Sequence, residues 1–174
     1  MVSAQSRKAQ PVLKTIQSDI SLDSMDTVNE VNAKLGFAAQ AIHLGVDYNK
    51  MSDGSGIGGY FFYQTSKKSG AAVIVPQVIS LGATYKMNLI DNSKLLAYAA
   101  PGFGIHMAKE VGASSTGTAS DETLIGPVFK IGTQFKLKPT FAIGLERQAF
   151  INWFSDKVTS GEYVFYSVAG TFWF

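Results

Sequence analysis

Residues 125–137 read IGPVFKIGTQFKL, and two kinds of side chain alternate within this stretch. The odd positions are mostly large and apolar, as at Phe129, Ile131 and Phe135, whereas the even positions carry glycine or polar side chains such as Lys130, with Val128 as the exception. Successive residues of a β-strand point to opposite faces of a sheet, so a period of two predicts a strand with one apolar face. The same pattern recurs along most of the chain and decides the fold class.

The alternation is equally regular in residues 73–87, 95–107, 141–153 and 163–174. Two earlier segments, 34–49 and 56–66, fit the pattern less cleanly. In the first of them the apolar phase changes between Gln40 and Ile42, which predicts a β-bulge at that point. The sequence therefore predicts seven strands of about 11–16 residues, longer than the usual five or six.

The composition excludes several classes of protein. Only 16% of the 174 residues are charged, although 46% are hydrophobic, and charged residues make up about a quarter of an ordinary soluble domain. No apolar run approaches the roughly 20 residues of a membrane-spanning helix. The chain has no Cys and two His, which excludes thiolate and multi-histidine metal sites, and we expect no cofactor. A net charge of +2 is too small to indicate nucleic-acid binding.

The two faces of the predicted strands differ in a way that indicates a membrane. One face is rich in Gly, Ala, Ser and Thr with few ionisable groups, which is too little charge for contact with water but suits a narrow barrel interior. The other face is a column of Val, Ile, Leu and Phe suited to hydrocarbon. Aromatic side chains gather at the strand ends, as in the girdles of membrane barrels. Those near the short turns are Tyr48, Tyr85, Phe135, Phe141, Phe172 and Phe174, and those toward the other end are Trp153 and Tyr166.

The fold class predicted by this pattern is all-β: a transmembrane, antiparallel, up-and-down β-barrel. Short connections alternate with mostly longer ones along the chain, and the short ones lie at 50–55, 89–94 and 137–140. A bacterial barrel has an even number of strands and both termini on the short-turn side. An eighth strand is therefore expected before the segment that begins at residue 34.

The N-terminal region has a different composition, with no Gly or aromatic residue in the first 35 positions. We expect residues 1–33 to be an extension that contributes the first strand at about 12–22, and residues 34–174 to form the barrel. The alternative is a short helix over 27–36, with Thr27 and Glu30 as a capping box. No apolar segment follows the first residue, so a mature form without a signal peptide is expected.

Polar side chains on the small-residue face form the candidate site. The residues expected to line the lumen are Glu146, Lys130, Lys86, Gln134, Gln148, His106, His43 and Asp47. A lone charge in a narrow lumen costs several kcal/mol of desolvation, so these charges must pair. We expect Glu146 to pair with Lys130, because their strands share the turn at 137–140. The network is interpreted as polar core packing, and a gate that sets a small conductance is the alternative.

Arg147 departs from the pattern, since its odd position places it on the lipid-facing side near the middle of a strand. Arginine at such a position costs ~2–4 kcal/mol in a membrane barrel. A second bulge that turns Arg147 inward is the preferred explanation. Contact with a partner or with a lipid phosphate is the alternative.

The C-terminal residues 167–174, SVAGTFWF, resemble the terminal assembly signal of bacterial outer-membrane proteins. Ser167, Phe172 and Phe174 match that signal, whereas Ala169 stands where glycine is usual and Gly170 comes one position late. Over residues 34–174 the chain resembles the small eight-stranded barrels of the outer membrane protein A, X and W kind. The resemblance implies an integral monomer in bacterial outer-membrane lipid, with the barrel-assembly machinery and periplasmic chaperones as transient partners. It implies no active site.

A catalytic role finds little support in the sequence. Barrel lipid A deacylases use a lipid-facing His-x-Ser motif, and this chain has Ala108 in place of the serine after His106. The Gly-rich residues 53–59 lack the Lys-Ser/Thr ending of a phosphate-binding loop. We expect a structural or surface-interaction role with at most a small pore. The alternatives are a lipid-modifying barrel enzyme and a soluble, lipocalin-like barrel that binds an apolar ligand.

Overall fold

The computed structural model describes residues 27–38, 41–69, 72–75, 77–111, 120–151, 153 and 162–174. Eight strands form a closed barrel: β1 (Val28–Ala38), β2 (Ala41–Ser52), β3 (Ser55–Gln64), β6 (Gln77–Asp91), β7 (Leu95–Val111), β8 (Ser120–Lys138), β9 (Phe141–Ile151) and β10 (Glu162–Trp173). Two short strands, β4 (Lys67–Ser69) and β5 (Ala72–Val75), form a separate two-stranded sheet. The prediction of an all-β barrel with eight strands is confirmed.

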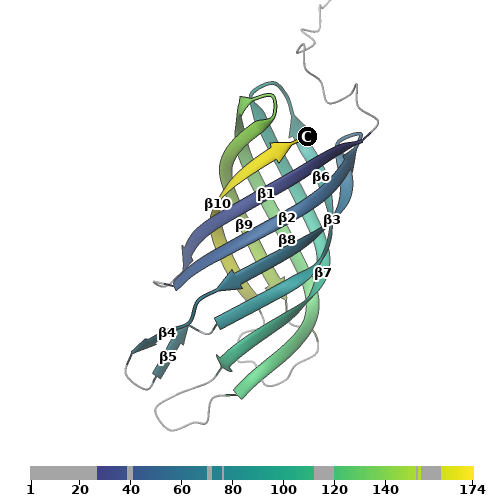
Figure 1. The fold of residues 1–174 in the computed structure, drawn as a ribbon. Helices are drawn as coiled ribbons and strands as arrows, with labels where there is room; N and C mark the ends of the chain where they lie inside the picture. Colours follow the sequence, from purple (N-terminus) through teal and green to yellow (C-terminus); the bar gives the residue numbers. More distant parts are fainter. Residues whose placement is uncertain are drawn as a thin grey trace, which may run out of the picture.

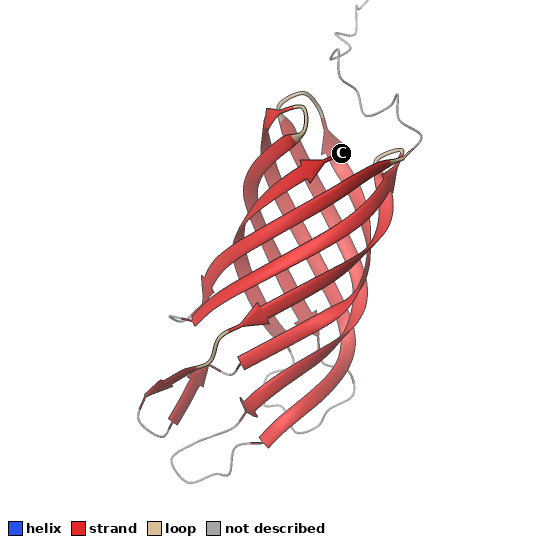
Figure 2. Cartoon of the chain, in the orientation of Figure 1, coloured by secondary structure: helices blue, strands red, loops and turns tan. Residues whose placement is uncertain are grey.

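Each barrel strand pairs antiparallel with the next one along the chain, so the topology is up-and-down (Figures 1 and 2). The barrel closes between β1 and β10, where the register runs from Glu30 opposite Trp173 to Gly36 opposite Ser167. In the described part of the chain there is no helix long and apolar enough to cross a membrane.

The structure corrects the prediction for the N-terminal part of the barrel. The segment predicted as one bulged strand over 34–49 is a hairpin of β1 and β2, in which Ala38 pairs with Ala41. The place in the barrel assigned to residues 12–22 is occupied by β1, and the helix considered over 27–36 is a strand. Residues 12–22 themselves lie outside the described residues. The phase change near Gln40 arises because the chain reverses direction there.

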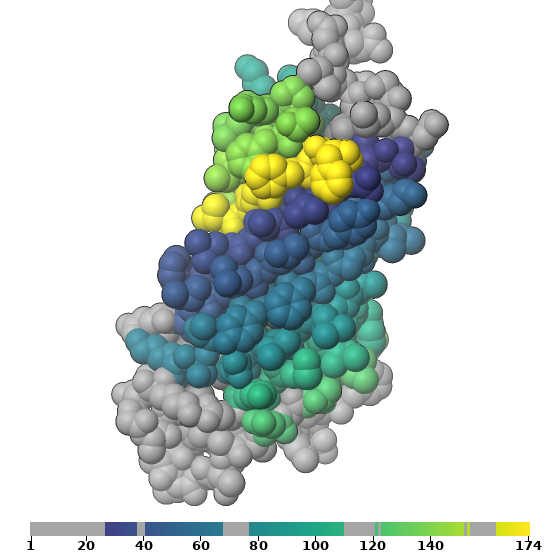
Figure 3. Space-filling model, in the orientation of Figure 1, coloured from purple at the N-terminus to yellow at the C-terminus, as the bar shows by residue number. Residues whose placement is uncertain are grey.

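The alternation of the two faces is confirmed by burial. In β2 every second side chain is buried, from Ala41 to Met51, and those between are exposed. Over the barrel as a whole, the exposed side chains are largely apolar and include Leu44 on β2, Phe61 on β3 and Leu145 on β9. Figure 3 shows this outer surface, where aromatic rings of the yellow C-terminal segment lie beside the purple β1. The outside of this barrel is therefore apolar.

The two ends of the barrel differ. The tight turns and the C-terminus lie at one end (Figure 1). In the turn between β2 and β3, Asp53 and Gly54 adopt positive φ angles of 49° and 73°. The β4–β5 hairpin lies at the opposite end. β6, β7 and β8 are 15, 17 and 19 residues long, against 11 or 12 for β1, β2, β9 and β10. The strands β6, β7 and β8 therefore form a longer side of the barrel.

Candidate functional site

All eight residues predicted for the lumen are at most 5% exposed and lie on inward-facing positions of five strands. They are His43 and Asp47 on β2, Lys86 on β6, His106 on β7, Lys130 and Gln134 on β8, and Glu146 and Gln148 on β9. The structure adds buried polar residues on β1, of which Glu30, Asn32 and Lys34 take part in the same network. Together these side chains line the interior of the barrel.

Lys34 is at the centre of the first group of charges. Its Nζ lies 2.5 Å from Oδ2 of Asp47 and 2.5 Å from Oε1 of Glu146. Asp47 also binds Lys130, with 2.8 Å between Oδ1 and Nζ. The second oxygen of Glu146 accepts a hydrogen bond of 2.5 Å from the hydroxyl of Tyr98. Two lysines and two carboxylates therefore neutralise one another inside the barrel, as buried charges must.

Glu30 is at the centre of the second group, nearer the tight-turn end. Its Oε1 lies 2.5 Å from Nζ of Lys86 and accepts a hydrogen bond of 3.0 Å from the amide of Asn49. Its Oε2 accepts a hydrogen bond of 3.1 Å from the indole nitrogen of Trp173. The ammonium group of Lys86 lies 4.0 Å from the ring centroid of Tyr98, at a distance typical of a cation–π contact. Tyr98 therefore lies between the two charged groups.

The predicted pair of Glu146 with Lys130 is wrong. The register places Lys130 opposite Gln148 and Glu146 opposite Gly132, so the two side chains are diagonal neighbours on adjacent strands. Glu146 binds Lys34 and Lys130 binds Asp47 instead. In a barrel of this size a lysine side chain reaches the opposite wall, so adjacency along the sheet does not determine the partner.

The contribution of β1 was missed by the sequence analysis, although the sequence contains a signal for it. In residues 30–35 the even positions are Glu30, Asn32 and Lys34, and the odd positions are apolar. This is the period-2 pattern with polar side chains facing inward. We instead predicted an extension up to residue 33 and a strand from residue 34, with a short helix over 27–36 as the alternative because Thr27 and Glu30 also have capping-box spacing.

An aromatic layer lies inside the barrel toward the end with the longer connections. Its buried members are Tyr60, Phe62, Val78, Ala108, Val128, Phe150 and Phe165. His43 and His106 lie against this layer, with ring centroids 5.3 Å from Phe62 and 4.3 Å from Phe150, respectively. Nε2 of His43 is 2.9 Å from Oγ of Ser167, and Nδ1 of His106 is 2.6 Å from Oγ of Ser80. Both histidines are thus part of the packed interior.

The charged lumen has balanced charge. In the part of the chain that the structure describes, its buried ionic side chains are the three lysines and three carboxylates Lys34, Lys86, Lys130, Glu30, Asp47 and Glu146. Among the described residues there is no group of three or more His, Cys, Asp or Glu that could hold a metal ion. Each of these charges has an opposite charge beside it, and the ion pairs link strands across the barrel.

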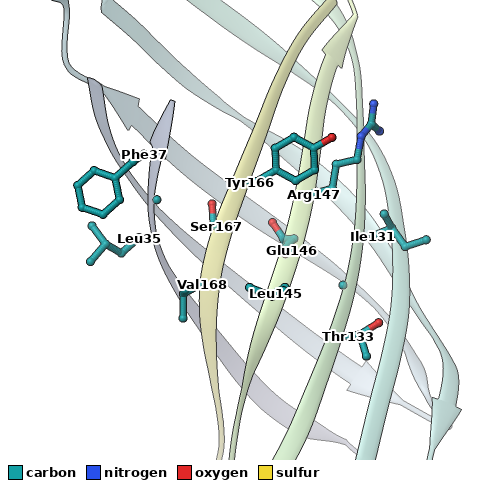
Figure 4. A pocket seen from close by; sticks show the side chains of 12 residues that line it. Leu35, Phe37, Ile131, Thr133, Leu145, Glu146, Arg147, Tyr166, Ser167 and Val168 are labelled. Carbon is teal, nitrogen blue, oxygen red and sulfur yellow. The ribbon is translucent and has the colours of Figure 1, made fainter. Parts of the chain in front are cut away.

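Arg147 is not turned inward by a bulge. The register of β9 with β10 is continuous and places Arg147 opposite Tyr166, and on the other side Arg147 is opposite Ile131. These side chains are on the outer face of the barrel and line a groove of about 750 Å³ (Figure 4). The rest of the lining is Leu35, Gly36, Phe37, Gly132, Thr133, Leu145, Glu146, Ser167 and Val168. The bulge prediction is therefore wrong, and the outward position stands.

The residues assigned to the assembly signal lie on both faces of β10. Ser167 is buried and faces the lumen, where it contacts His43. Phe172 and Phe174 are exposed on the outer face, and the ring of Phe172 lies 4.6 Å from that of Phe141. The exposed aromatic residues expected at the tight-turn end are therefore present at the position of a girdle.

No known family model matches the sequence, and no curated protein sequence matches it. Among solved structures, the chain is similar to Neisserial surface protein A, with a TM-score of 0.58 and 12% identity, over 83% of this chain and 93% of that chain. It is also similar to the Yersinia pestis outer membrane protein Ail in a phospholipid bilayer nanodisc, with a TM-score of 0.54 and 14% identity, over 84% of this chain and 99% of that one. The chain thus has the fold of small outer-membrane β-barrels, as its sequence resemblance predicted.

Proposed function

We propose that this chain is an integral protein of the bacterial outer membrane. The observation that carries the proposal is its inverted polarity. Three lysines and three carboxylates are buried in the interior, whereas large apolar side chains such as Leu44, Phe61 and Leu145 are about half exposed or more on the outside. A soluble barrel has the opposite arrangement, because water solvates charge and excludes apolar surface. A closed sheet also satisfies the backbone hydrogen bonds that hydrocarbon cannot.

The proposed partners follow from this location. Outer-membrane lipid contacts the apolar face, and Phe172 and Phe174 at the C-terminus serve the barrel-assembly machinery as a recognition signal. Periplasmic chaperones bind the unfolded chain in transit. We propose a monomer as the functional unit.

The proposed role is structural or surface-interacting, with a lumen that conducts little or nothing. Two layers support this: the charged groups in the middle and the aromatic layer toward the longer connections. The longer side formed by β6, β7 and β8 extends toward the β4–β5 hairpin and offers surface for a partner. The names of the similar structures describe a surface protein and an outer membrane protein.

A non-enzymatic role is favoured by the placement of His106. This histidine faces the lumen against Phe150 and Ser80, away from the lipid on which a lipid A hydrolase acts. Lipid A of unchanged mass after co-expression is the expected result. A mass shift of one acyl chain would support the enzyme instead.

The membrane location is tested by refolding from urea. We expect folded protein only in detergent micelles or phospholipid vesicles, seen as a band whose gel migration changes on boiling. Vesicle-bound protein should resist extraction with alkaline carbonate. A folded, monodisperse barrel in buffer without detergent would contradict the proposal and support the soluble ligand-binding alternative.

The gate interpretation of the charged lumen is tested with Glu146→Ala. Loss of this carboxylate leaves Lys34 bound to Asp47 and removes the acceptor for the Tyr98 hydroxyl. We expect the free energy of unfolding to fall by about 1–3 kcal/mol, with planar-bilayer conductance unchanged. A new steady conductance at unchanged stability would show that Glu146 gates a pore.

A further inference from the structure

The outer groove around Arg147 combines a cation with an otherwise apolar surface. Arg147 is the only Lys, Arg, Asp or Glu among the described outward-facing side chains of β1, β9 and β10. Its neighbours across the sheet are Tyr166 on one side and Ile131 on the other. Ionisable side chains at membrane depth are rare, and they usually mark a functional contact.

The groove consists of two rows of side chains that follow the hydrogen-bonding direction. The first row contains Tyr166, Arg147 and Ile131. The second row is Leu35, Val168, Leu145 and Thr133, which the register places side by side on four strands. One row thus offers a guanidinium group and a hydroxyl, and the other offers mainly aliphatic surface.

The groove lies at the seam where the barrel closes. The pairing of β1 with β10 ends at Gly36 and Ser167, although β10 begins five residues earlier, at Glu162. Phe37, whose side chain is 66% exposed, lies just beyond this last pair. The groove therefore extends from the end of β1 across β10 and β9 to β8.

The guanidinium group is directed toward the end of the barrel with the longer connections. In Figure 4 it lies beyond Tyr166, in the direction away from Val168, and the Tyr166 hydroxyl is drawn on the Arg147 side of the ring. Arg147 is four residues before Ile151, the last residue of β9, which corresponds to about 10 Å along the axis of a tilted barrel. A long arginine side chain can cover part of that depth toward a polar headgroup.

We propose that this groove binds one anionic, phosphate-bearing lipid, with Arg147 contacting the phosphate and the row from Leu35 to Thr133 contacting an acyl chain. The inference rests on the proposed membrane location. Guanidinium matches phosphate in both charge and geometry, since it donates two parallel hydrogen bonds. Tyr166 adds one hydroxyl donor on the same side. The aliphatic row has the chemistry of a hydrocarbon chain and holds the lipid in register with the seam.

The test uses folded full-length protein in neutral detergent and native mass spectrometry. Phosphatidylglycerol and phosphatidylcholine with identical acyl chains are titrated separately, and the retained lipid is counted. Wild type should retain one phosphatidylglycerol in preference to phosphatidylcholine. Arg147→Gln should weaken phosphatidylglycerol retention roughly tenfold, as expected for the loss of a charge-assisted pair, and leave phosphatidylcholine unchanged.

Two further variants separate the site from general attraction between charges. Lys50→Gln removes an exposed lysine on the outer face near the tight turns, and should leave the first lipid bound. Val168→Trp keeps Arg147 but fills the apolar row, and should also reduce retention. An equal loss in Lys50→Gln, or no loss in Arg147→Gln, would overturn the proposal. Protein dimers that vanish with Arg147→Gln would assign the groove to a second copy and overturn it as well.

The lipid proposal and the membrane proposal fail in different ways. Each variant is first checked for boiling-dependent gel migration, which reports folding independently of lipid retention. A wild type that folds into a monodisperse barrel in buffer without detergent would defeat the membrane location. A wild type that folds in detergent without any preference for phosphatidylglycerol would defeat the lipid site alone.

Discussion

Replacement of Lys34 with methionine is expected to lower the free energy of unfolding by about 3–5 kcal/mol, the usual cost of removing one partner from a buried ion pair. Nζ of Lys34 lies 2.5 Å from carboxylate oxygens of both Asp47 and Glu146. Without it, Asp47 keeps Lys130 but Glu146 keeps only neutral partners. A buried carboxylate without a cation is costly, because the interior offers no water to solvate it. Urea-induced unfolding from phospholipid vesicles measures the change.

Lys136→Met is the matched control for Lys34→Met. Lys136 also forms an ion pair, with Asp91, but these side chains are 13% and 27% exposed near the tight-turn end. Partial exposure lets water screen the pair, so the expected loss is at most about 1 kcal/mol. Equal losses in the two variants would contradict a special role for the buried network. A Lys34→Met barrel as stable as wild type would show that the charges in the lumen are solvated.

The outer face of the barrel could be predicted because it depends only on local alternation. Whether Leu145 or Phe129 faces outward follows from the parity of its position within a strand, which no distant contact alters. Eight strands followed from the even number required by the positions of the termini. Burial in β2, β8 and β10 therefore agrees with the sequence prediction at almost every position.

The beginning of the barrel could not be placed because the turn lacks the usual signals. Residues 38–41 read AAQA, without the Gly, Asn, Asp or Pro that marks a hairpin turn. A reversal of the chain and a bulge both shift the apolar phase, so the sequence alone did not separate them. This error also affected the prediction of the site. Glu30 was assigned to an extension and Lys34 to the first position of the strand predicted over 34–49, although both belong to β1, where Glu30 binds Lys86 and Lys34 binds Asp47 and Glu146.

The ion pairs inside the lumen could not be predicted from the sequence, because they depend on the three-dimensional geometry of the barrel. Lys130 on β8 reaches Asp47 on β2, which is four strands away around the barrel. Lys34 on β1 and Glu146 on β9 meet across the strand between them, β10. This contact is possible because β10 has the small residues Ser167 and Ala169 at the intervening inward positions. Such contacts depend on barrel diameter and on small side chains at intervening positions, and alternation contains no information on either.

Glu30→Ala is expected to cost about 3–5 kcal/mol as well, because it leaves Lys86 buried without a carboxylate. It also removes the acceptor for the indole of Trp173, so the first and last strands lose a side-chain link at the seam. Trp173→Phe isolates that link, since it retains an aromatic ring and leaves the Glu30–Lys86 pair in place. We expect this control to lose about 1 kcal/mol, the typical net value of one hydrogen bond. Vesicle-based urea unfolding again supplies the measurement.

The double variant Glu30→Leu with Lys86→Met separates the two causes of that loss. If the cost of Glu30→Ala comes mainly from an uncompensated cation, the removal of both charges should recover much of it, because well-packed apolar replacements of a buried pair are often neutral. We therefore expect the double variant to be more stable than Lys86→Met or Glu30→Leu alone, with a coupling energy of about 2–3 kcal/mol. Additive losses would mean that Glu30 and Lys86 act independently, Glu30 through Asn49 and Trp173 and Lys86 through the Tyr98 ring. In that case the balance of charge in the lumen would not be what stabilises the seam.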